Sequence, residues 1–600
     1  MKRFDQRRLR WSLLGATAIL AALTAAAQRD VPPVLTVKSE TNLVLVDIVV
    51  TDKGRAVHGI DKGQFHLTED GKEQKIVSFE EHKPGTETPV TREPLPPNVY
   101  SNKPVYPSKA AVNVLLLDGL NTPVQGQMQA RAQMIDYLGK IPAGTPMAIF
   151  ALSSQLKIVQ GFTTDPAALV KAVKGARANS AQSPILESSL TPDYGPDISN
   201  GIANASGGDL VGGGMAAAVV KQFESDVQAF QLDVRTRMTL DALNQLAMYL
   251  NGIPGRKNLI WFSGSFPLSL DPEKLDGSSL STMADYSKEL RRTNVMLATA
   301  RVAVYPVDAR GLLNATSVDA SAANAPCRTS NACQADGGSI TSGDKSVLTG
   351  IVEDHQSMEE MAAETGGRAF VNTNDFGQAV TGAIDHGGSY YSIAYSPTTK
   401  QTDGLYHKLK LKVDGASYSL AYRQGYFSDS KSKGANGKGA QASLMLEATK
   451  RGAPPATEIL FQARVLAADD PEIASGPKLT AVSTGEMSKD LKGPTKRYVV
   501  DSLIDIHGFR FEDAPDGKKT TQAELTLVGY DIDGKRLNYL DRGVELSFAP
   551  DLYAKRLETG VPLRTVIDLP AGHTFLRIAV RDVGGSKVGS MEVPLTSASK

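Results

Sequence analysis

The sequence has few cysteines, few tryptophans and no excess of either charge. Only Cys327 and Cys333 occur among 600 residues, which excludes a framework of several disulfides. Lys and Arg together number 65, as do Asp and Glu, so no basic excess indicates nucleic acid as a partner. The hydrophobic fraction of 41% and the charged fraction of 22% are typical of a globular protein, and the length allows several domains.

Residues 1–27 have the pattern of a signal peptide. A positive region from Lys2 to Arg10 precedes an apolar run rich in Leu and Ala, and small residues end this run at Ala27, before Gln28. The apolar run falls short of the ~20 residues that span a bilayer. We therefore expect a periplasmic or secreted protein. An uncleaved anchor is the alternative, and only in that case would the chain contact the membrane.

The two cysteines flank a short segment rich in small and polar residues. In an exported chain, a disulfide between Cys327 and Cys333 is the natural prediction, and two free thiols are the alternative. A zinc site would need more ligands, and no histidine lies nearby in the sequence.

Residues 110–385 alternate between predicted strands and helices. Residues 112–117 form an apolar run, as in a strand buried on both faces, and stop at Asp118. Further strands are predicted at 147–152, 155–162, 258–262 and 302–307, and helices at 127–140, 223–250, 286–299, 353–365 and 376–384. Such alternation predicts a parallel sheet with helical crossovers.

The sequence on both sides of this segment has β-character. Residues 35–83 and 386–427 each contain alternating strand patterns but are too small to bury a core alone, so we expect them to form one β-sandwich that the central segment interrupts. Residues 84–109 are Pro-rich and 428–440 are rich in Gly, Ser and Lys, and both are expected to be linkers. Residues 441–600 predict a C-terminal β-sandwich.

The chain resembles the von Willebrand factor A-related domain family of Acidobacteria over roughly residues 35–427. The matching stretches are residues 49–52, 65–70, 115–123, 256–267, 305–311, 365–376 and 390–397. The resemblance implies an α/β fold with a doubly wound, mostly parallel, A-type (Rossmann-like) sheet inserted in the β-sandwich. It implies export and no known activity.

The resemblance also implies a metal site, but the chain lacks some of its donors. Asp118 and Thr122 match the first motif, whereas Leu120 stands where a hydroxyl is needed and Gly264 where an aspartate is needed. Thr163 or Thr164 is the candidate for a neighbouring threonine ligand. Mg²⁺ requires near-octahedral oxygen ligation. The site is therefore expected to be degenerate, with Asp118 and Thr122 organising the loops and no cofactor bound. Weak Mg²⁺ binding through Asp118, Thr122 and Thr164 is the alternative.

Polar residues follow several strands and are expected to gather at the edge where parallel strands end. Besides Asp118 and Thr122, these are Asn121, Ser263, Ser265, Asp308 and Arg310. Asp308 and Arg310 either pair with each other or present a charged rim. This edge and the insertions predict a protein-binding, adhesion or scaffold module with an unidentified protein partner.

Catalytic motifs are scarce. The sequence around Ser263 lacks the Gly-x-Ser-x-Gly elbow, and no His-Glu-x-x-His pair occurs. Asp354 and His355 lie in a predicted helix, where a solvated surface position is expected. We therefore predict no enzymatic activity and no catalytic residues. The alternative is an envelope hydrolase that uses polar residues at the same edge, which would require perturbed carboxylates or histidines in a pocket.

Overall fold

The computed structural model describes residues 43–83, 95–104, 111–142, 144–175, 212–265, 286–311, 342–397, 405–415, 417–428, 444–474, 484–489, 494–585 and 587–596. The predicted signal peptide and the predicted Cys327–Cys333 disulfide lie outside the described residues. Within those ranges, no helix is both long and apolar enough to cross a membrane.

A five-stranded sheet forms the centre of the chain, in the order β11-β10-β7-β8-β9. Its strands are β7 (Val112–Asp118), β8 (Met147–Leu152), β9 (Leu156–Thr163), β10 (Lys257–Ser263) and β11 (Val302–Asp308). The pairs β10–β11, β10–β7 and β7–β8 are parallel, whereas β9 runs antiparallel to β8. Each of these five strands was predicted within two residues of its observed bounds.

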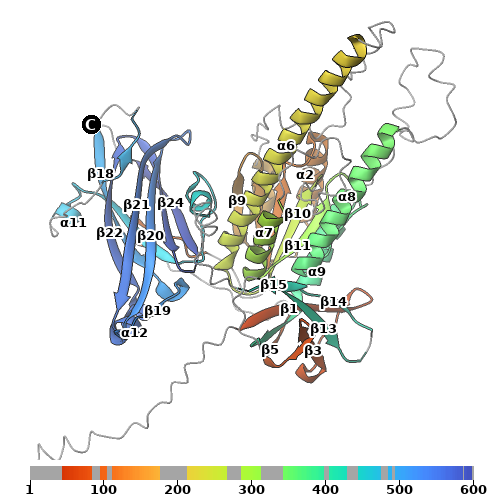
Figure 1. Ribbon diagram of the computed structural model, residues 1–600, viewed down its shortest axis with the longest axis horizontal. Helices are drawn as coiled ribbons and strands as arrows, with labels where there is room; N and C mark the ends of the chain where they lie inside the picture. The colour runs from red at the N-terminus through yellow and green to blue at the C-terminus, as the bar shows by residue number, and fades with distance from the viewer. Residues whose placement is uncertain are drawn as a thin grey trace, which may run out of the picture. The chain divides into compact units, whose positions relative to one another are not determined.

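Helices cover both faces of this sheet (Figure 1). The helices α6 (Gly212–Asn251), α7 (Ser287–Thr299) and α8 (Ser342–Thr365) share one apolar cluster with Val114 and Leu116. The helices α2 (Val124–Leu138), α3 (Pro166–Gly175) and α9 (Phe376–Gly388) share the other cluster with Leu115. Successive residues of a strand point to opposite faces. This alternation explains why β7 is an almost continuous apolar run.

The two flanks of the central segment pair directly, as the sequence predicts. The first flank supplies β1 (Val44–Asp52), β2 (Arg55–Ala56), the 3₁₀ helix η1 (Lys62–Gln64), β3 (Phe65–Glu69), β4 (Lys72–Gln74) and β5 (Ile76–His82). The second supplies β12 (Tyr390–Tyr395), β13 (Tyr406–Val413), β14 (Ser419–Ala421) and β15 (Gly425–Phe427). Two sheets result, ordered β14-β1-β12-β5 and β15-β13-β3-β4, with one shared apolar cluster (Figure 1, red and teal strands).

An ion pair joins the flank sheet to the central sheet. Arg301, immediately before β11, donates from Nε to Asp47 Oδ2 at 2.9 Å and from Nη2 to Asp47 Oδ1 at 2.6 Å. Ser392 of β12 donates to the same carboxylate at 2.6 Å. Burial alone would raise the pKa of Asp47, but the hydrogen bonds and charge of Arg301 outweigh it, and the net pKa lies below its ordinary value.

The C-terminal region is an antiparallel sandwich of two sheets, ordered β22-β18-β16-β6 and β17-β21-β20-β23-β24, with β19 on β20. A shared apolar cluster contains Val500 and Ile567 from the first sheet and Leu527 and Ile578 from the second. The elements are β16 (Phe461–Ala467), α11 (Pro471–Ala474), β17 (Glu486–Met487), β18 (Thr495–Ile504), η5 (Ile506–Gly508), β19 (Glu512–Asp513), β20 (Lys519–Tyr530), β21 (Arg536–Phe548), α12 (Pro550–Thr559), β22 (Val561–Pro570), β23 (His573–Asp582) and β24 (Val588–Thr596).

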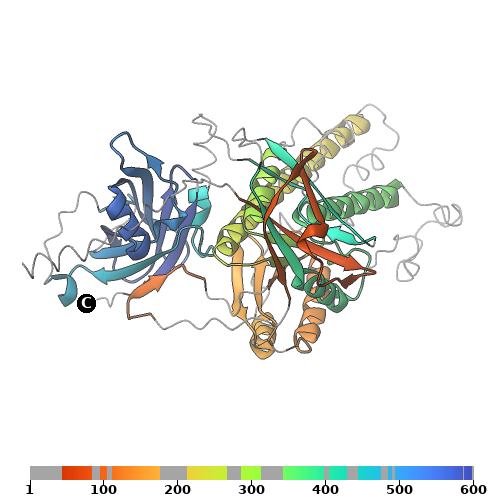
Figure 2. The same cartoon turned by 90° about the horizontal axis from the view of Figure 1, so that it is seen from below.

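The strand β6 (Val99–Ser101) comes from the segment that the sequence suggested was only a linker. It pairs with β16, and Figure 2 shows this orange strand beside the blue strands of the C-terminal region. Next to it, the buried Asn102 side chain donates to the carbonyls of Ala456 and Ile459, each at 2.7 Å, and accepts from the Phe461 amide at 2.8 Å. Residues 99–102 are therefore part of the C-terminal sandwich.

The fold class predicted from the sequence, a doubly wound and mostly parallel α/β fold, is wrong for the chain as a whole. Of the five sheets that the described residues form, four contain antiparallel pairs only. Parallel pairing between strands is confined to the central sheet, where three of the four strand pairs have it. Strands that follow one another through short turns pair antiparallel. Some pairs of the flanks and the C-terminal region form in this way, such as β3 with β4 and β20 with β21, and others join strands far apart in the sequence, such as β1 with β12 and β3 with β13. Antiparallel β-structure therefore dominates.

Candidate functional site: a polar edge of the central sheet

Three parallel strands bring polar residues together where they end. The last residues of β7, β10 and β11 are Asp118, Ser263 and Asp308, and Ser263 lies opposite Asp308 in the register of β10 and β11. Strands that run in one direction end at one edge, so the side chains that follow them meet there. The sequence correctly predicted that these three residues share an edge.

Asp118 is fully buried and accepts five hydrogen bonds. Its Oδ1 accepts from the amides of Leu120 and Asn121, at 3.0 and 2.9 Å. Its Oδ2 accepts from Asn121 Nδ2 at 2.9 Å, Trp261 Nε1 at 3.0 Å and Ser263 Oγ at 2.9 Å. Burial raises the pKa of Asp118, although these hydrogen bonds oppose the shift. Both carboxylate oxygens are therefore committed to protein donors.

Thr122 and Gly264 lock the two loops together. The buried Thr122 Oγ1 accepts from the Gly264 amide at 2.9 Å. A Cβ at Gly264 would lie 3.1 Å from Pro123 Cδ and 3.2 Å from Thr122 Cα. An aspartate at position 264 would therefore require the loop to shift. Leu120 stands at the position where the metal motif needs a hydroxyl. Its side chain is 1% exposed and is part of the apolar core.

Thr164 does not join this edge, so its assignment as a ligand is wrong. It follows β9, whose Thr163 lies opposite Met147 at the start of β8. Asp118 lies opposite Leu152, at the far end of β8. Because β9 runs antiparallel to β8, the residues after β9 emerge at the opposite edge of the sheet.

Asp308 and Arg310 form an ion pair, the simpler of the two predictions for these residues. Arg310 donates from its amide and Nε to Asp308 Oδ1, each at 2.9 Å, and from Nη2 to Oδ2 at 3.0 Å. Its Nη1 reaches Asp354 of α8 at 2.8 Å. Burial lowers the pKa of Arg310, but the bonds to Asp308 and Asp354 outweigh it and raise the net value.

Asp354 and His355 belong to the site, which corrects the expectation of a solvated helix surface. His355 Nε2 lies 2.7 Å from Asp308 Oδ2, and Ser265 Oγ donates to Asp354 Oδ1 at 3.5 Å. The side chains of Arg310, Asp354 and His355 are 17%, 17% and 13% exposed. These three residues form the accessible rim of the edge, and Asp118 and Asp308 lie beneath it.

Sequence reasoning missed Arg235 on α6. Its side chain is 5% exposed, and Nε and Nη1 have no hydrogen-bond partner. Burial lowers the pKa of Arg235, and the charges of Asp118 and Asp354 oppose that shift. A fixed cation therefore offsets the carboxylates of the edge. The available signal was its spacing, since Arg235, Thr239 and Leu243 recur at helical intervals on the inward face.

The two serines of the edge hydrogen-bond to carboxylates and not to a histidine. The single Ser263 hydroxyl hydrogen has two acceptors within reach, Asp118 Oδ2 at 2.9 Å and the Ser265 carbonyl at 2.6 Å, and Ser265 Oγ donates to Asp354. A serine nucleophile needs a neighbouring base such as histidine, to accept its proton. His355 contacts Asp308 instead. Among the described residues of this edge, no group of three metal-ligating side chains occurs either.

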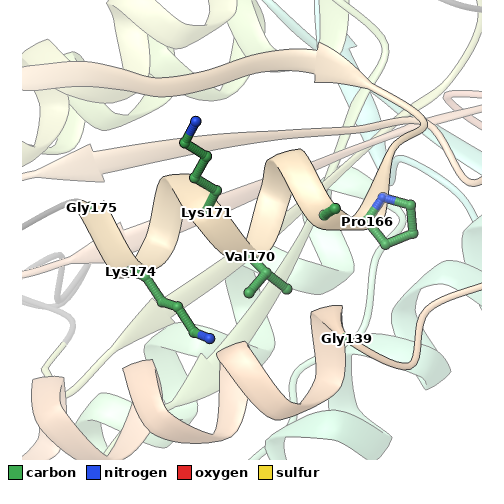
Figure 3. A pocket seen from close by; sticks show the side chains of 7 residues that line it. Gly139, Pro166, Val170, Lys171, Lys174 and Gly175 are labelled. Atoms are coloured by element: carbon green, nitrogen blue, oxygen red, sulfur yellow. The ribbon is translucent and has the colours of Figure 1, made fainter.

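A separate pocket of about 770 Å³ lies between α2 and α3. It is lined by Gly139, Pro166, Ala167, Val170, Lys171, Lys174 and Gly175, and Figure 3 shows the lysine side chains beside it. None of the edge residues lines this pocket, and its only titratable side chains are the two lysines. It therefore offers no acid–base pair for catalysis.

Comparisons with known proteins give no family for this chain. No family model and no curated protein matches it. Among solved structures, it is similar to the three N-terminal domains of the type V pili tip protein Mfa5 from Porphyromonas gingivalis. That similarity has 9% identity and a TM-score of 0.21, and covers 88% of this chain and 78% of the other. A TM-score this low does not establish a shared fold.

Proposed function

We propose that the chain is an exported, non-enzymatic protein-binding or scaffold module. It binds its partner, without a metal ion, through the rim of Arg310, Asp354 and His355. The observation that carries this proposal is the set of five protein hydrogen bonds to Asp118. A metal-dependent edge needs a carboxylate free to bind the ion. This carboxylate instead holds its own loop and β10 in place.

The rim has the properties of a polar contact surface on a rigid support. Its ion pairs are partly exposed, and beneath them Asp308 is buried with 0% exposure. Polar groups at the margin of an interface determine orientation and partner choice more than affinity. We propose a protein as the partner, and the balanced charge of the chain argues against nucleic acid. Membership of the von Willebrand factor A-related family remains a proposal based on the order of the sequence motifs.

Capture from envelope extract tests this function. Wild type, Asp354→Asn and Lys171→Gln serve as baits, each with Mg²⁺ and with EDTA. Asp354→Asn removes one rim charge with little change of shape, and Lys171→Gln removes one charge from the distant pocket. The proposal predicts a partner that wild type and Lys171→Gln retain in EDTA and that Asp354→Asn retains less. A partner lost in EDTA, or held equally by all three, would contradict it.

Export is tested separately. Mass spectrometry of the protein from its native host should find a terminus near Gln28 in a periplasmic or secreted fraction. An intact Met1 terminus in the cytosol would refute export and leave the binding proposal standing.

A further inference from the structure

A second cluster of chemically capable side chains lies in the sandwich formed by the two flanks, independent of the edge described above. Glu69 ends β3, Asp70 follows it in the turn to β4, and His407 lies on β13, which pairs with β3. Asp70 has a φ of +49° and is followed by Gly71 at +80°. This left-handed turn keeps Asp70 beside β13, where its amide donates to the Lys408 carbonyl at 2.9 Å.

The ligand atoms of the three residues converge. His407 Nδ1 lies 2.8 Å from Asp70 Oδ2 and 3.6 Å from Glu69 Oε1, and all three atoms lie within 4.8 Å of one another. A tetrahedral zinc ion with bonds of about 2.0–2.1 Å holds its ligand atoms roughly 3.3 Å apart. The two distances from His407 Nδ1 fall on either side of that value. Small side-chain rotations would therefore suffice for all three atoms to bind one ion.

Neighbouring groups orient both carboxylates. The Tyr395 hydroxyl donates to Glu69 Oε2 at 2.7 Å, and the Lys408 amide donates to Asp70 Oδ1 at 2.9 Å. In each carboxylate one oxygen is thus fixed by a donor and the other faces His407. Metal sites commonly use this arrangement to hold their ligands in position.

The cluster is also open to solvent on one side. Glu69 and His407 are almost fully buried, whereas the Asp70 side chain is 46% exposed. Solvent can reach the cluster along Asp70 and supply a water ligand.

We propose that Glu69, Asp70 and His407 form a binding site for one divalent transition-metal ion of the zinc type, with water at the remaining position. Imidazole favours zinc and similar ions, whereas Mg²⁺ and Ca²⁺ prefer sites made of oxygen alone. Asp70 and His407 are 337 residues apart in the sequence. A bound ion would therefore fasten the first flank to the second and stabilise the sandwich that the central segment interrupts.

Calorimetric titration with Zn²⁺ tests this site. The protein is the chain from residue 28 onward, without a histidine tag and stripped with a chelator. Asp70→Asn and His407→Gln each remove one ligand. The matched control is His66→Gln, because His66 also lies on β3 and contacts a carboxylate across to the second flank, Asp414 Oδ2 at 2.7 Å.

The proposal predicts one Zn²⁺ per chain in wild type and in His66→Gln, and at least about 100-fold weaker binding in Asp70→Asn and His407→Gln. Substitution with Co²⁺ should give visible absorption in the first two proteins and not in the last two. Because Asp70 is partly exposed, Asp70→Asn is expected to fold, and circular dichroism verifies this. Absence of stoichiometric binding in wild type, or equal binding in all four proteins, would overturn the proposal.

Discussion

Replacing Asp118 by alanine should destabilise the central sheet strongly, with or without a divalent ion. The change leaves the amides of Leu120 and Asn121 and the Trp261 indole without this acceptor. The Asn121 side chain and the Ser263 hydroxyl each lose one acceptor and keep another, Thr239 Oγ1 and the Ser265 carbonyl. A buried donor left unsatisfied costs about 1–3 kcal/mol, and water entering the space vacated by Asp118 recovers part of this. The expected loss in the free energy of unfolding is on the order of 4 kcal/mol.

Asp118→Asn separates hydrogen bonding from charge. An asparagine has one acceptor oxygen, so either the two donors at Oδ1 or the three at Oδ2 would face an amide nitrogen. This variant should lose about 2–3 kcal/mol, less than the alanine variant. If Asp118 served mainly as a metal ligand, removing its charge in metal-free buffer would be neutral or stabilising instead.

The fluorescence of Trp261 can be used to measure how these substitutions change the stability of the central sheet. The sequence has two tryptophans, Trp11 and Trp261, so the chain lacking residues 1–27 keeps only the one that donates to Asp118. Urea unfolding followed by its fluorescence therefore reports on the central sheet, which matters because a chain with several domains is not expected to unfold in one step. An Asp118→Asn midpoint equal to or above that of wild type, in EDTA, would refute the reasoning.

Three further predictions concern other parts of the chain. Asp47→Asn should cost about 3 kcal/mol at neutral pH, because it leaves the Arg301 guanidinium unpaired. Since the pKa of Asp47 is lowered in the folded state, its stabilisation is complete above the unfolded value near 3.8 and is lost as pH falls below it. The variant should therefore show a flatter acid limb in unfolding experiments, and an unchanged limb would count against this. Asn102→Ala should lower the thermal midpoint of the C-terminal sandwich in calorimetry by at least a few degrees, whereas no change would mean that residues 99–102 are dispensable. Peptide mapping without reduction should find Cys327 linked to Cys333, and free thiols at both positions would contradict the predicted disulfide.

The local elements of the central sheet could be predicted from the sequence because each strand is an apolar run of limited length. The run Val112 to Leu117 contains no charged residue, because its side chains pack in the apolar clusters on both faces of the sheet. The pairing of the flanks was also predictable, because neither flank has enough strands to bury a core alone. The class of the whole chain was not, because apolar patterning does not show how strands pair, and most strands outside the central segment, such as β20 and β21, pair antiparallel.

The composition of the edge was only partly predictable. Asp118, Ser263 and Asp308 each end a recognisable strand, so the sequence places them together. Thr164 was misplaced because sequence periodicity does not give the direction of β9. Asp354 and His355 were missed because a helix pattern does not say which neighbour covers its polar residues.

Arg235 and the strand β6 were not predicted, because both depend on contacts between distant segments. Arg235 reaches the edge from a helix more than a hundred residues after Asp118, and only the packing of α6 brings the two charges together. The strand β6 is short and lies in Pro-rich sequence, so its pairing with β16 depends on residues more than three hundred positions away.

The central claim is that Asp118 organises the edge without a metal ion. Calorimetric titration of the chelator-stripped chain with Mg²⁺ tests it most directly, with Asp118→Asn and His407→Gln titrated in parallel. The account predicts no micromolar binding of Mg²⁺ by any of the three proteins. Micromolar binding by wild type and His407→Gln that disappears in Asp118→Asn would contradict it.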